Sequence, residues 1–136
     1  MSVILSDQDK LTVRTAAYGA VSLLAAAAAG TGSPHKVAAQ GSIALHSATG
    51  LIGHVLAEKA EVGEVDGRST AEIADRVLPA LTAAMELLKK QAPEEAGNFR
   101  STVLVAVEAA TRTGKGEPGP VLTAMTDKIT QALDAA

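Results

Sequence analysis

Apolar residues recur at helical spacing through most of the chain, whereas the alternation typical of strands is sparse. The first predicted helix begins after Ser6, whose hydroxyl is suited to cap it, and ends at Gly30. A turn of sequence Gly-Thr-Gly-Ser-Pro leads to a second predicted helix, Val37–Ala57, which continues to about Ala60. The two helices together contain most of the uncharged part of the chain.

Three further helical patterns follow an acidic, turn-rich loop. One begins after Ser69, with Glu72 completing a capping box, and it carries an amphipathic stripe that Pro79 is expected to kink or break. The next begins at Pro93 and the last at Pro120, because proline is well tolerated at the first helical position. Five or six helices with short connections predict an all-α fold, a compact helical bundle that forms a single domain over residues 1–136.

A long uncharged tract lies in the first half of the chain. Between Thr15 and Ala57 the only full charge is Lys36. Such a tract must be buried on more than one side, in protein, in lipid or against a ligand. A membrane span needs about 20 apolar residues, and Thr15–Ala29 is too short. Val37–Ala57 is long enough, but its favourable insertion terms reach only about −4 kcal/mol before its polar residues are counted. We therefore predict no membrane span.

Composition narrows the classes of function. Alanine leads an apolar share of 47%, the net charge is −3, and there is no cysteine. Without clustered basic residues a nucleic-acid partner is not expected, and without thiols there is no disulfide framework or cysteine metal site. Asp7 and Asp9 offset Lys10 and Arg14 before the apolar stretch, so a cleaved signal peptide is disfavoured and we expect a cytoplasmic protein.

One face of the second predicted helix is too uncharged for a surface in open solvent. At 100° per residue, small and weakly polar residues gather there, opposite the apolar face that points inward. Each interior glycine costs about 0.8–1 kcal/mol relative to alanine, so a gain elsewhere is expected. The face can be covered by a neighbouring helix, by another subunit or by an apolar ligand. Its candidate binding residues are Ser42, His46, Gly50, Gly53, His54 and Ala57.

Two histidines on this helix offer the alternative of a metal or small-molecule site. His54 and Glu58 are four residues apart and can face one ion, and His46 lies two turns before His54. A His-Glu-x-x-His motif is absent, as are the nucleophile elbow, the phosphate loop and the dinucleotide-binding glycine pattern. No catalytic residue and no cofactor are predicted. The first hypothesis is a non-enzymatic protein that binds another protein or copies of itself; the alternative binder, possibly hydrolytic, would use His46, His54 and Glu58.

The C-terminal third resembles a segment of small bacterial helical proteins that are similar to the tellurite-resistance TerB family. The resemblance lies in Leu88–Arg100, in Val103–Thr111 and in the glycine-rich turn that follows. It implies an all-helical bundle with a loosely defined stress-related or scaffolding role. The family's acidic metal pattern follows the first helix, where this chain has Ala29–Gly32 without an acid. The resemblance therefore implies no metal site here.

Overall fold

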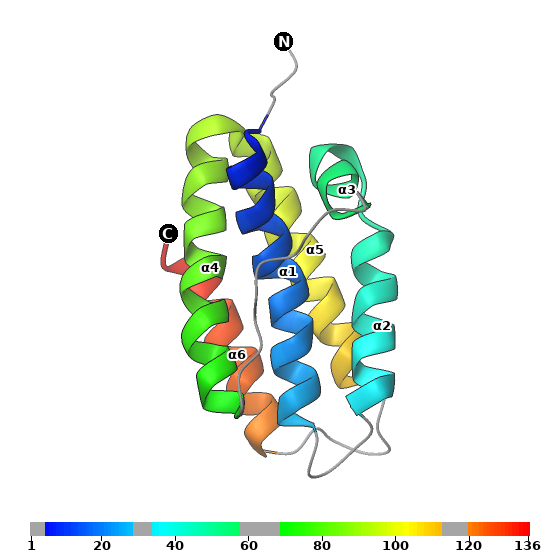
Figure 1. Ribbon diagram of the computed structural model, residues 1–136. Coiled ribbons are helices and arrows are strands. Elements are labelled where there is room, and N and C mark those ends of the chain that lie inside the picture. Colours follow the sequence, from blue (N-terminus) through cyan, green and yellow to red (C-terminus); the bar gives the residue numbers. More distant parts are fainter. Residues whose placement is uncertain (1–4, 29–33, 58–68, 113–119) are drawn as a thin grey trace.

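The computed structural model describes residues 5–28, 34–57, 69–112 and 120–136, and these residues form six α-helices and no β-strand (Figure 1). The predicted all-α bundle is confirmed. The ends predicted at Gly30 and Ala60 and the loops at 61–67 and 113–119 lie outside the described residues. In chain order the helices are α1 (Asp7–Ala27), α2 (Pro34–His46), α3 (Gly50–Ala57), α4 (Thr70–Gln91), α5 (Pro93–Thr111) and α6 (Pro120–Asp134).

Helix α1 forms the centre of the bundle and contacts all five other helices. It lies between α2 and α4, which do not contact each other in the described part of the chain (Figure 1). Helices α2, α4 and α6 run opposite to α1, and the short α3 lies across one end, beside α5 (Figure 1). The uncharged residues of α1 are thus explained by burial inside the protein.

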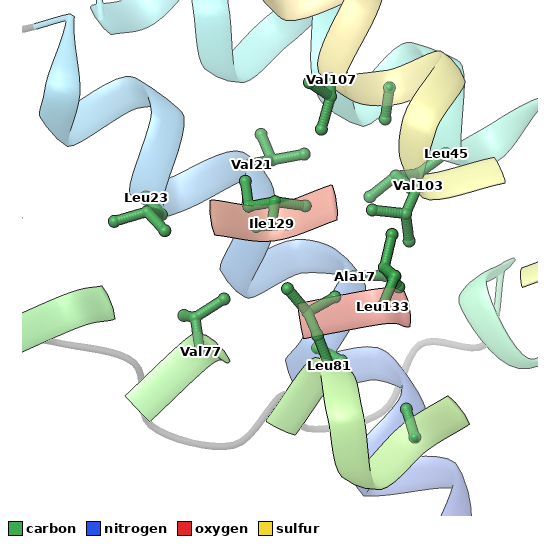
Figure 2. Packing of buried hydrophobic residues seen from close by; sticks show 14 of the residues in the cluster. Ala17, Val21, Leu23, Leu45, Val77, Leu81, Val103, Val107, Ile129 and Leu133 are labelled. Carbon is green, nitrogen blue, oxygen red and sulfur yellow. The ribbon is translucent and has the colours of Figure 1, made fainter. Parts of the chain in front are cut away.

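Small residues make this central packing close. Ala16, Ala17 and Ala20 of α1 are almost completely buried. Around them lie branched side chains from the neighbouring helices, among them Val77 and Leu81 of α4 and Ile129 of α6 (Figure 2). Because alanine buries little area by itself, the helices must approach closely for dispersion contacts to accumulate. The predicted inner faces of α4, α5 and α6 supply these contacts.

Local capping rules account for most helix starts. The Ser6 hydroxyl accepts a hydrogen bond from the Asp9 N–H at 3.0 Å, and the Ser69 hydroxyl accepts one from the Glu72 N–H at 3.2 Å. Each bond satisfies one of the N–H groups that a helix start leaves without a partner. Pro93 and Pro120 are the first residues of α5 and α6, as predicted. These boundaries follow from nearby residues alone.

The predicted break at Pro79 does not occur. Helix α4 runs from Thr70 to Gln91 with Pro79 inside it. Proline removes the hydrogen bond that would reach the Asp75 carbonyl one turn earlier. Asp75 and Pro79 are both exposed on the outer side of α4, so water can take the place of the missing donor.

The prediction of one continuous helix from Val37 to Ala57 is wrong. The chain leaves helical geometry at residues 47–49, so α2 ends at His46 and α3 begins at Gly50. Gly50 has a φ of +70°, in the left-handed region that favours glycine. Helices α2 and α3 therefore have different directions. The uncharged face that was predicted along one straight helix does not exist as a single helix face.

Arg100 of α5 and Asp134 hold the last helix in place. The Arg100 Nε donates to the Asp134 carboxylate at 2.8 Å, and this hydrogen bond lowers the pKa of Asp134 below its ordinary value. The Thr82 hydroxyl of α4 donates to the Ala132 carbonyl at 2.7 Å.

Within the described ranges, no helix is both long enough and apolar enough to cross a membrane.

Gly41 and Gly97 differ in the space around them, so substitutions at these two positions test the packing. A methyl group at Gly41 of α2 would lie 2.8 Å from both γ-methyls of Val21, a buried β-branched residue of α1 that has little freedom to move. A methyl group at Gly97 of α5 would meet nothing within 4 Å. Gly41 therefore permits the close approach of α2 to α1, whereas Gly97 has no such role within the chain.

We expect Gly41→Ala to lower the free energy of unfolding by about 1–3 kcal/mol through overpacking against Val21. Gly97→Ala should raise the same free energy by about 0.5–1 kcal/mol, because alanine favours the helix. Urea denaturation of each variant at low protein concentration measures both changes. A stabilising Gly41→Ala would contradict the close contact between α1 and α2.

Candidate functional site

The corner between α2 and α3 is held by two side chains of α5. The Leu51 N–H donates to the Glu95 Oε1 at 2.6 Å, so the Glu95 carboxylate caps the start of α3. The Asn98 Nδ2 donates to the Thr49 carbonyl at 2.9 Å and to the Glu95 Oε2 at 3.2 Å. These contacts satisfy the backbone where the helix is interrupted, and they fix the corner on α5.

Two of the predicted site glycines are required by this corner. A Cβ atom at Gly50 would lie 2.8 Å from the Glu95 Oε1, in addition to the strain of its positive φ. A Cβ atom at Gly53 would meet the Ala48 carbonyl oxygen, because the turn folds back on the first residues of α3. Both glycines therefore have at least a structural function, because a larger residue at either position would force neighbouring atoms to move.

A shallow, open hollow beside the corner is lined by most of the predicted site residues. The hollow has a volume of about 250 Å³. His46, Gly50, His54 and Ala57 are exposed around it, and Gly53 is half-buried. Ser42, the sixth predicted residue, does not line it. The described residues that line it are His46, Ala48, Thr49, Gly50, Gly53, His54 and Ala57.

Tyr18 of α1 connects this hollow to the core. Its ring meets the His46 ring edge-on with centroids 6.1 Å apart, and its hydroxyl donates to the Leu56 carbonyl at 2.7 Å. Burial raises the pKa of Tyr18, and the positive charge of Arg14 opposes this shift only in part. Tyr18 therefore stays a neutral hydrogen-bond donor that ties the end of α3 to α1.

The metal interpretation receives little support from this arrangement. His46 and His54 line the same hollow although they belong to different helices. The described residues contain no group of three or more histidine, aspartate or glutamate side chains that could hold an ion. Glu58, the predicted third ligand, lies outside the described residues. A metal or small-molecule site at His46, His54 and Glu58 stays a prediction.

A second, larger surface, which is uncharged in its middle, extends from the corner along the seam of α2 and α5. A groove of about 210 Å³ adjoins the first hollow, since both are lined by Ala48 and Thr49. Farther along the seam lies a hollow of about 440 Å³. We call this surface the α2–α5 face and define it by its outermost uncharged residues, which are Gln40 and Ile43 of α2, Ser47 of the turn after α2, and Gly97, Ser101 and Val105 of α5.

Two branched apolar side chains on the α2–α5 face are exposed to solvent in the described structure. Ile43 is 62% exposed and Val105 is 53% exposed. Transfer of such side chains out of water is favourable by roughly 1.5–3 kcal/mol each when burial is complete. An exposed apolar surface with polar ends is typical of a site that binds a partner.

Sequence reasoning missed the residues that organise this region. Glu95 lies in the first turn of its own helix, where an acidic residue is ordinary, so the sequence does not indicate that its carboxylate caps α3. Asn98 carried no local signal at all. At helical spacing Val105 does not share a face with Phe99 and Val103, which is the one hint in the sequence that it is exposed.

Comparisons with known proteins give no match for this chain. No protein-family model matches the chain, and no curated protein or solved structure is significantly similar to it. The resemblance to the TerB family stays a prediction that rests on the residues quoted for it.

The pKa of Tyr18 can be measured selectively because the chain has one tyrosine and no tryptophan. Since burial raises the folded-state pKa above the unfolded value, the native state holds the phenol proton more tightly. The resulting stability is fully present below a pH of about 10 and falls as the pH rises beyond it. We expect the phenolate absorbance of the native protein to titrate above this pH, and that of the urea-unfolded chain near it. Equal midpoints would show that Tyr18 is not buried against α3.

Proposed function

We propose that this chain is a non-enzymatic binding protein whose partner is another protein chain. The partner is bound by the α2–α5 face and the adjoining hollow at the corner. The observation that carries the proposal is the exposure of Ile43 and Val105 on a surface whose middle is uncharged. Burial of such a surface by a partner gains hydrophobic free energy without the desolvation of a full charge.

The hydroxyl groups near this face favour binding over catalysis. The Ser47 Oγ donates to the Ala44 carbonyl at 2.7 Å, and the Thr102 Oγ1 donates to the Asn98 carbonyl at 2.8 Å. A nucleophilic hydroxyl would instead donate to a general base such as histidine or a carboxylate. Because these hydroxyl groups donate hydrogen bonds to nearby backbone carbonyls, the surface is less polar than its composition suggests.

The shape of the face fits a helical or otherwise convex partner. The seam between α2 and α5 forms a shallow groove lined by small residues, and an amphipathic helix can place its apolar side chains in such a groove. A scaffolding role of this kind agrees with the role that the TerB resemblance implies.

Site-specific photocrosslinking in the native cell tests this function. A photoreactive residue in place of Val105 should give a crosslinked protein adduct, because the partner covers that position. The matched control is Val121 of α6, which is equally exposed at 53% but lies outside the α2–α5 face. Mass spectrometry of the adduct identifies the partner as another protein or as a copy of this chain. No adduct at Val105, or equal adducts at both positions, would contradict the proposed binding face.

A further inference from the structure

Helix α3 is packed onto one end of the bundle rather than into its centre (Figure 1). In the described part of the chain it contacts α1, α2 and α5 but neither α4 nor α6. Helices α1, α4, α5 and α6 all contact one another, and α2 contacts α1 and α5 directly. The packing of these five helices therefore does not require α3 to be in place.

The sequence of α3 gives this helix little stability of its own. It has eight residues, and isolated helices shorter than about 12 residues are marginal in water. Gly50 and Gly53 lower its helical propensity further. Its buried side chains are those of Ile52, Val55 and Leu56. Helix α3 therefore depends on its contacts with the other helices.

Three hydrogen bonds from other helices hold α3 in place. The Glu95 carboxylate of α5 accepts a hydrogen bond from the Leu51 N–H at the start of α3. The Asn98 amide of α5 donates to the backbone carbonyl just before the helix. The Tyr18 hydroxyl of α1 donates to the Leu56 carbonyl near its end. These bonds attach both ends of α3 to the bundle, so α3 can leave as a unit only when all three break.

We infer that α3 is a lid that opens and closes on the bundle while the other five helices stay folded. Its hinge consists of residues 47–49, which are not helical. His46, the last residue of α2, stays beside α1 through its edge-on contact with the Tyr18 ring. Segments with few buried apolar side chains open locally at a lower free energy than the whole protein. The inference does not depend on the binding of a partner at the α2–α5 face.

Opening of the lid changes two surfaces. The buried side of α3 separates from α1 and α5, so apolar surface that is covered in the closed state becomes accessible. The hinge moves as well, and its residues Ala48 and Thr49 line the groove of the α2–α5 face. Asn98, which holds the hinge, lines the same groove. The groove is therefore complete only when α3 is closed.

Native-state hydrogen exchange of the full chain, followed by NMR, tests this inference. After correction for intrinsic exchange rates, the Val55 and Leu56 amides should exchange at least about tenfold faster than the Leu23 and Leu24 amides of α1. Their exchange should also depend less on urea, because local opening exposes less surface than unfolding does. Equal rates with equal urea dependence would overturn the inference, since α3 would then open only with the whole bundle. Unprotected amides in α3 would overturn it too, since the lid would not close.

Glu95→Ala tests the contact that keeps the lid closed, with Glu94→Ala as the matched control. Glu94 is exposed beside Glu95 in the first turn of α5, so each variant loses one negative charge at the same helix start. Glu95→Ala should speed exchange of the Val55 and Leu56 amides by about tenfold or more, because a hydrogen bond to a charged group is lost. Glu94→Ala should leave these rates within about twofold of wild type. Equal effects of the two variants would overturn the role of Glu95 in closing the lid.

Tyr18→Phe tests the hydrogen bond at the other end of α3. This variant keeps the aromatic ring and loses the hydroxyl that donates to the Leu56 carbonyl, so the Val55 and Leu56 amides should exchange about fivefold faster. Unchanged exchange rates would contradict the part that Tyr18 has in holding the lid. Absence of the Val105 crosslink would overturn the proposed function and leave the lid standing, whereas equal exchange in α1 and α3 would overturn only the lid.

Discussion

Helix α1 buries several alanines beside its valines and leucines, and where alanine forms the contact a neighbouring helix must come close before enough surface is buried to stabilise the bundle. The contact between Gly41 and Val21 shows how close this approach is for α2. A charged side chain on the inner part of α1 would have to be buried with a partner at considerable cost. The lack of charge in α1 after Arg14, which is itself buried, is therefore a condition of the fold.

Helix α2 carries no full charge after Lys36, although only part of its surface is buried against α1 and α5. Its outer side, with Gln40, Ile43 and, in the turn after the helix, Ser47, is open to solvent in the chain as described. A solvated helix face normally carries charged residues, and nothing in the internal packing explains their absence here. The packing of the described chain likewise gives no reason for a glycine at position 97 of α5, where a side chain would have open space. Burial by a second molecule accounts for both observations at once.

The fold was predictable where local rules decide it. The caps at Ser6 and Ser69 and the prolines that open α5 and α6 act within a few residues, so the sequence reveals them directly. The interruption of Val37–Ala57 was not predictable, because its cause is distant. Ser47, Ala48 and Thr49 do not by themselves stop a helix; the Glu95 carboxylate and the Asn98 amide, more than forty residues later, replace the lost hydrogen bonds. Most of the predicted site residues still line one hollow, because the corner brings them together. Ser42 was predicted on the assumption of one straight helix, and because the helix is interrupted it does not line that hollow.

The claim that the α2–α5 face is an interface is tested most directly by methyl NMR spectra of the labelled protein recorded in buffer and in lysate of its native cell. Ile43, Val105 and Val121 are the exposed branched reporters in the described structure, and Val121 lies outside the face. In the lysate the signals of Ile43 and Val105 should shift from their positions in buffer, because a partner covers them, while those of Val121 should keep their positions. Constant signals from all three residues, or an equal shift of Val121, would contradict this account.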